Sequence, residues 1–140
     1  MKFPLKNGIL GVVGAVVFAT AAPVNAASFY ECDTDSKEAM NWVSPKIGFI
    51  FDDAGKVSVI DGIIQTYFET PIAAKARKRG DKVRITWRIA NAIDAAGERI
   101  PTFSYVANLN LVSKTVHVIA KPVGFPQRFA GKGTCKIHNK

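Results

Sequence analysis

Residues 82–91 have the sequence Lys-Val-Arg-Ile-Thr-Trp-Arg-Ile-Ala-Asn. From Lys82 to Ile89 the odd-numbered side chains are apolar and the even-numbered side chains are polar or positively charged. A period of two residues over eight positions is difficult to produce on a helix, because helical neighbours are three and four residues apart. This stretch therefore predicts a strand with one buried face and one basic, solvent-facing side.

The same alternation recurs on both sides of this strand. Turn residues separate the segments, and short connections force neighbouring strands to be antiparallel. A meander of this length tends to close, because closure removes exposed strand edges. We predict an all-β fold, a small antiparallel meander of about eight strands that forms a closed or strongly curved barrel. The predicted strands are 29–33, 47–51, 57–60, 63–68, 82–91, 103–111, 116–120 and 128–137.

One segment departs from the pattern and predicts a short basic helix at 71–79. Thr70 can cap it, Pro71 suits the first helical position, and the alanines that follow favour helix. Gly80 would end it. Asp61-Gly62 is interpreted as a hairpin turn. Residues 34–45 fit either a short helix or an ordered loop.

The two cysteines, Cys32 and Cys135, lie near the two ends of the predicted domain. In an oxidising compartment a disulfide is the default, and two lone cysteines without a CxxC spacing make a poor metal site. We expect a Cys32–Cys135 bond, which requires the first and last strands to be neighbours with Cα atoms about 5.5–6 Å apart. On the last strand Gly131 and Gly133 share the inward parity of Cys135, which predicts either a bend or a close approach of another backbone.

Residues 1–26 have the three parts of a secretory signal. Lys2 and Lys6 precede an uncharged apolar stretch, and Val24-Asn25-Ala26 fits a small-x-small cleavage site. We expect cleavage after Ala26, leaving residues 27–140 as a single periplasmic or secreted domain. Without Lys2 and Lys6, 17 Lys and Arg face 11 Asp and Glu, a net charge of +6.

No segment carries a catalytic or metal-binding motif. His117 and His138 are expected to be ordinary surface residues, and Asp52-Asp53 sits in a predicted turn, where Asp bonds nearby amides. Asp33 and Asp35 lack the remaining ligands of a calcium loop. We therefore expect no enzyme activity, no catalytic residue, no metal and no cofactor.

Basic residues are the main functional signal. A positive surface favours anionic partners, although surfaces of small domains are rich in Lys and Arg in any case. If the surface is functional, we expect it to bind an anionic envelope polymer, a lipid headgroup or another macromolecule. The first basic stripe comprises Lys75, Arg77, Lys78, Arg79, Arg84 and Arg88. A second outward stripe, on the last strand, comprises Arg128, Lys132 and Lys136. Whether the two stripes join is open.

Two alternatives to a basic binding surface remain. The first is a barrel that binds one small apolar ligand inside, because the aromatic residues on core parity either fill the interior or line a cavity. Trp42 lies outside a clear strand and is a candidate for an exposed contact residue. The second alternative is a protein inhibitor or structural envelope protein that acts through exposed loops.

Overall fold

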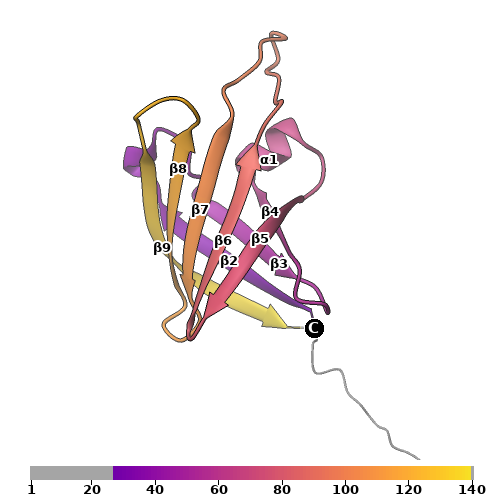
Figure 1. Cartoon of the computed structure of the whole chain (residues 1–140), viewed down its shortest axis with the longest axis vertical. Coiled ribbons are helices and arrows are strands. Elements are labelled where there is room, and N and C mark those ends of the chain that lie inside the picture. The colour runs from indigo at the N-terminus through magenta and orange to yellow at the C-terminus, as the bar shows by residue number, and fades with distance from the viewer. Residues whose placement is uncertain (1–26, 140) are drawn as a thin grey trace, which may run out of the picture.

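The computed structural model describes residues 27–139 and forms a closed barrel of eight antiparallel strands, each paired with its neighbours in the chain (Figure 1). The predicted fold class is confirmed. The predicted signal sequence lies outside the described residues. The strands are β2 (Ser28–Asp35), β3 (Lys46–Phe51), β4 (Val57–Asp61), β5 (Ile72–Arg79), β6 (Lys82–Ile89), β7 (Phe103–Asn110), β8 (Thr115–Pro122) and β9 (Phe129–Asn139).

The first and last strands close the barrel, and the predicted disulfide joins them. Cys32 lies directly opposite Cys135, and the two residues form the bond. Their Cα atoms are 3.9 Å apart, closer than expected. The Cys135 N–H donates to Lys114 O on the β8 side, so Cys32 and Cys135 are a non-hydrogen-bonded pair, the pairing that brings Cα atoms closest. Such a bond is typical of an oxidising compartment.

The glycines of β9 explain how β2 and β9 approach so closely. A Cβ built on Gly133 would overlap the carbonyl oxygen of Asp33, and one on Gly131 would lie 3.0 Å from the carbonyl oxygen of Asp35. The predicted close backbone approach at both glycines is confirmed.

The one α-helix of the described residues is α1 (Gly62–Tyr67), and it does not lie at 71–79, where the chain forms β5. The Asp61 carboxylate caps α1 by accepting from the Ile64 N–H at 2.7 Å, so the predicted turn at Asp61-Gly62 is a helix start and the predicted strand at 63–68 is wrong. Ile64 is fully buried. Burying Ile64 and closing the sheet with β5 outweigh the helix propensity of the alanines, because propensity is a weak preference that tertiary packing overrides.

Residues 34–45, for which the sequence fits either a short helix or a loop, contain both. A single 3₁₀ turn, η2 (Lys37–Ala39), is followed by an ordered loop. Trp42 in this loop is half-buried and stacks on Phe103 with ring centroids 4.1 Å apart. The expectation of an exposed contact residue is therefore wrong, because the loop folds Trp42 back onto the core.

Aromatic side chains pack on one another inside the barrel. Trp87 stacks on Tyr105 with ring centroids 5.1 Å apart, and Trp87 and Phe49 meet edge to face with centroids 5.8 Å apart. All three are buried. This packing follows the inward parity that the sequence predicts on β3, β6 and β7. Within residues 27–139, no helix is long and apolar enough to cross a membrane.

Candidate functional site

The outer face of the β5–β6 hairpin is densely basic. Gly80 and Asp81 connect the two strands, and this tight turn fixes their register. Arg77 consequently lies opposite Arg84, and Arg79 lies opposite Lys82. Directly opposed side chains on one face are about 4.5–5.5 Å apart at Cβ, so these four cations form two adjacent like-charged pairs.

The strand register extends one of these pairs around the barrel wall. Arg84 is opposite Asn108 on β7, Asn108 is opposite His117 on β8, and His117 is opposite Lys132 on β9. Arg77, Arg84 and Lys132 thus belong to one continuous row of outward side chains, which reaches Asp35 on β2, opposite Lys132. The two basic stripes of the sequence meet across Asn108 and His117.

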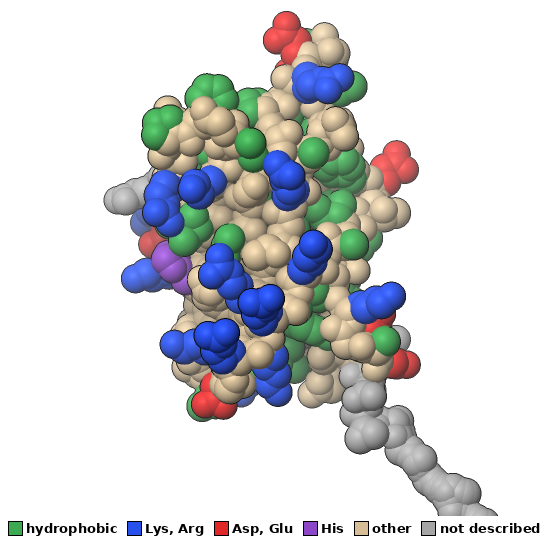
Figure 2. All heavy atoms as spheres, in the orientation of Figure 1, with side chains coloured by type: hydrophobic (Ala, Val, Ile, Leu, Met, Phe, Trp, Pro, Cys, Tyr) green, Lys and Arg blue, Asp and Glu red, His purple; other side chains and the backbone are tan. Residues whose placement is uncertain are grey.

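We call Arg77, Arg79, Lys82, Arg84 and Lys132 the basic band. Figure 2 shows Lys and Arg side chains gathered over the part of the wall that β5 to β9 form. Neighbouring strands are about 4.8 Å apart, so the row from β5 to β9 covers an arc of about 20 Å. An arc of this length can contact several charges of an extended polymer.

The other predicted basic residues lie outside this row. Lys75, two residues before Arg77 on β5, is opposite Thr86. Arg88, two residues beyond Thr86 on β6, is opposite Ser104 on β7. Lys78 is opposite Val83, a core residue, so it has the inward parity of β5 and does not belong to the outer face.

Of the second stripe, only Lys132 joins the band. Lys136 lies four residues further along β9, outside the row, and is opposite Glu31 on β2, just as Lys132 is opposite Asp35. Arg128 precedes β9 in the β8–β9 loop. The sequence predicts that these side chains point outward. It does not show which of them belong to the band, because that depends on the register between strands.

The band differs electrostatically from the adjoining part of the wall, which β2 and β3 form. There, Lys46 Nζ lies 3.1 Å from a carboxylate oxygen of Glu31 and 3.1 Å from one of Asp33. Hydrogen bonds from Lys46 and then from His138 lower the pKa of Glu31. Among the side chains that the structure describes, which exclude that of Glu38, none of the five band cations forms a salt bridge. Their charge is therefore available to an external anion.

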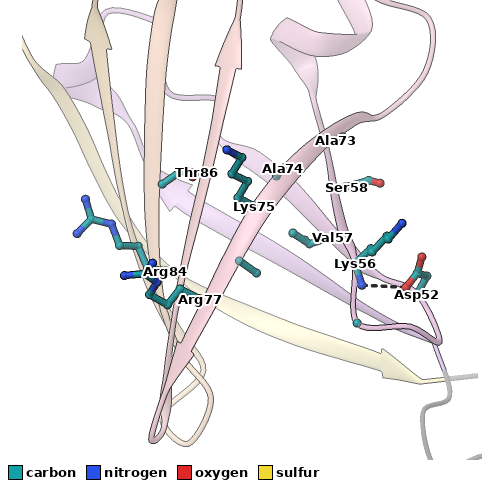
Figure 3. Close-up of a pocket in the computed structure, with 12 residues that line it drawn as sticks. Asp52, Lys56, Val57, Ser58, Ala73, Ala74, Lys75, Arg77, Arg84 and Thr86 are labelled. Carbon is teal, nitrogen blue, oxygen red and sulfur yellow. Dashed lines mark hydrogen bonds between the residues drawn. The ribbon is translucent and has the colours of Figure 1, made fainter.

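A groove of about 850 Å³ borders the band (Figure 3). One bank is the turn 52–56 with the start of β4, and the other is β5 from Ala73 to Arg77. Lys75, Arg77 and Arg84 contribute side chains to it, together with Lys56 from the opposite bank. The groove combines small apolar side chains with cations.

Asp61 is the buried acidic group that most resembles a catalytic residue. It is 4% exposed, and its Oδ2 has no hydrogen-bond partner within the described chain. Burial raises the pKa of its carboxyl, against the opposing effect of the Ile64 and Ile63 amides. Burial, and secondly the charge of Asp61, also raises the pKa of Tyr105. The Tyr105 hydroxyl donates to Trp42 O at 2.7 Å, so it has a structural role.

The two histidines lie on the outer wall in different surroundings. His138 Nε2 is 3.1 Å from Glu31 Oε1, whereas His117 stands in the row between Asn108 and Lys132. Within the described part of the chain, no three His, Cys, Asp or Glu residues gather in a way that could hold a metal ion. The basic band is therefore the best candidate for a functional site on the described surface.

Comparison of the chain with protein families, with curated proteins and with solved structures finds no match.

Proposed function

We propose that this barrel is an exported, non-enzymatic binding module whose basic band holds a flexible polymer rich in phosphate or carboxylate groups, such as an anionic component of the cell envelope. The observation that carries the proposal is the continuous row from Arg77 to Lys132, in which the cations form no salt bridge with another described side chain. Like charges placed directly opposite each other destabilise a sheet. An external polyanion would relieve that repulsion.

The curvature of the wall favours a flexible polymer over a flat membrane surface. The row runs around the barrel across five of its eight strands. A planar bilayer would touch a convex wall along a narrow line, whereas a flexible chain can follow the arc. The packed aromatic interior in turn makes the outer surface a better candidate than an internal site for an apolar ligand.

The test is binding of inorganic polyphosphate and of polyglutamate to the protein, measured by titration calorimetry across a series of salt concentrations. Affinity should fall steeply as salt rises, because bound counterions are released when cations contact a polyanion. Vesicles of anionic phospholipid provide the comparison with a flat surface and should bind more weakly at equal charge concentration.

Charge-matched variants locate the site. The triple variant Arg77→Gln, Arg84→Gln, Lys132→Gln should lose at least about tenfold in affinity and show a shallower salt dependence. A control triple variant, Lys37→Gln, Lys46→Gln, Arg99→Gln, removes the same charge from elsewhere on the described surface and should lose much less. Equal losses in both variants would mean that net charge, not the band, attracts the polymer.

A further inference from the structure

The barrel wall has an incomplete junction between β4 and β5. Val57 to Val59 pair with Ile72 to Ala74, and no residue of β4 pairs with β5 beyond Ala74. On its other side β5 stays paired with β6 as far as Arg79. The stretch 75–79 is therefore a strand edge on the β4 side of β5.

The backbone direction at this edge follows from the hydrogen bonds of the neighbouring hairpin. Asp52 N–H donates to Lys56 O, so Lys56 and Ser58 direct their backbone groups towards β3. Val57 must then face β5, because alternate residues of an antiparallel strand point to opposite sides. Its partner Ala74 faces β4 in return.

Two residues further along β5, Ala76 and Lys78 share the orientation of Ala74. Their N–H and C=O groups thus point to the open side, where the described chain offers no strand partner. Ala76 also lies opposite the fully buried Ile85 and has inward parity, yet it is exposed. This exposure indicates that the edge is accessible from outside.

The groove lies at the place that a further strand would occupy. It is lined on the inward side by Val57, Ala74 and Ala76, which are small or apolar, and on the outward side by Lys75 and Arg77. Figure 3 shows the cationic side chains of β5 on one bank and the 52–58 segment on the other. A strand added here would have small or apolar side chains next to its inward face and cations next to its outward face.

We propose that this edge binds an extended peptide segment of another protein, in which acidic and apolar residues alternate. The segment pairs antiparallel to β5, as every neighbouring pair in the barrel does. Its apolar residues lie opposite Ala76 and Lys78 and point towards the groove floor. Its acidic residues lie opposite Lys75, Arg77 and Arg79 and point outward.

Charge decides between this partner and a second copy of the same chain. Cations along a free edge oppose edge-to-edge pairing with another basic strand. Two copies would bring Lys75, Arg77 and Arg79 of each chain together, whereas an acidic segment would neutralise them. The inference does not depend on the proposed function, since a polyanion on the band needs no backbone pairing.

The experiment uses a capped peptide of about seven residues that alternates Glu and Val, a length typical of one strand. In the antiparallel arrangement the Val residues direct their N–H and C=O groups to β5. N-methylation of the central Val residues should therefore weaken binding at least about tenfold, as measured by fluorescence anisotropy. N-methylation of the central Glu residues, which face away from β5, is the matched control and should have little effect.

Amide exchange measured by NMR on the unmodified protein gives an independent readout. At a free peptide concentration about ten times Kd, exchange at Ala76 and Lys78 should slow about tenfold. Exchange at Lys75 and Arg77, whose amides already face β6, should change little. Absence of peptide binding, equal affinity of the two N-methylated peptides, or self-association of the protein through this edge would each overturn the proposal.

Discussion

Arg77 and Arg84 stand directly opposite each other on neighbouring strands of the outer wall, and neither forms a salt bridge within the described chain. Two like charges so placed repel across the ladder. The arrangement lowers the stability of the isolated barrel and at the same time concentrates positive charge at one place. The concentrated positive charge favours binding of an anion, whereas it does not favour folding.

The first prediction concerns this pair. Arg77→Gln and Arg84→Gln should each leave the barrel as stable as before or slightly more stable, because each removes the repulsion. In a double-mutant cycle the pair should show an unfavourable coupling of about 0.2–1 kcal/mol at low salt. Urea unfolding at low and high salt measures it, and the coupling should shrink at high salt. A favourable coupling would show that the two guanidinium groups stack instead of repelling.

The second prediction concerns pH. Because burial raises the pKa of Asp61 above its ordinary value, the folded state binds this proton more tightly than the unfolded state. The stability that Asp61 contributes is therefore present below the unfolded pKa, about 3.9, and is lost as pH rises through the folded pKa. Asp61→Asn should accordingly gain stability relative to the parent protein more at pH 7 than at pH 4, as measured by urea unfolding.

Asp61→Ala separates the capping role from the titration. Asparagine can still accept the Ile64 N–H, whereas alanine cannot, so Asp61→Ala should lower the free energy of unfolding by about 0.5–2 kcal/mol relative to Asp61→Asn. If Asn and Ala behave alike at both pH values, the cap contributes nothing to the fold.

The third prediction concerns the closing strands. A Cβ at Gly133 would overlap the Asp33 carbonyl, so Gly133→Ala forces β2 and β9 apart. We expect a loss of about 1–3 kcal/mol in thermal or urea unfolding. Gly131→Ala, where the nearest atom is 3.0 Å away, is the graded control and should cost less. The reverse order would contradict the packing described here.

The fourth prediction concerns the disulfide. Cys32 and Cys135 enclose a loop with a sequence separation of 103, and in the chain-entropy model such a bond stabilises by up to about 4–5 kcal/mol. The variant Cys32→Ala, Cys135→Ala should unfold at a clearly lower urea concentration than the oxidised protein. Its circular-dichroism spectrum should still be that of a β-barrel, because strand pairing on both sides of the bond remains. An unchanged unfolding midpoint would show that the bond adds nothing to stability.

Much of the fold could be predicted because the signal was local. The alternation of apolar and charged residues from Lys82 to Ile89 is a property of one strand, and it predicts both the strand and its buried face. The cysteine pairing followed from there being one pair near the two ends of the domain. These features need no knowledge of distant residues.

The misplaced helix shows where local signals fail. The Ala-rich segment 71–79 has a high helix propensity, and Ile63 to Phe68 has the β-branched and aromatic residues of a strand. The barrel reverses both preferences, because it needs β5 to continue the wall and Ile64 to fill the core. The Asp61 cap was the sequence feature that could have shown where the helix begins.

The candidate site was only partly visible for a related reason. Outward parity of Arg84, Asn108, His117 and Lys132 could be predicted strand by strand. Their arrangement in one row depends on the register across three strand pairs, which the turns and the barrel closure fix together. Sequence reasoning also placed Lys78 with its neighbours on a helix, whereas strand geometry separates it from them.

The pairing of Ser28 with Asn139 brings the two ends of the described chain together at one rim of the barrel. A short linker could therefore join them, and cutting the chain at Gly80-Asp81 would give a circular permutant with the same strand order in space. In that permutant Cys135 and Cys32 would be separated by only a short stretch of sequence. The same sulfur–sulfur bond would then restrain a small ring and contribute much less entropy, so permutation would show how far this barrel depends on having its first and last strands tied together.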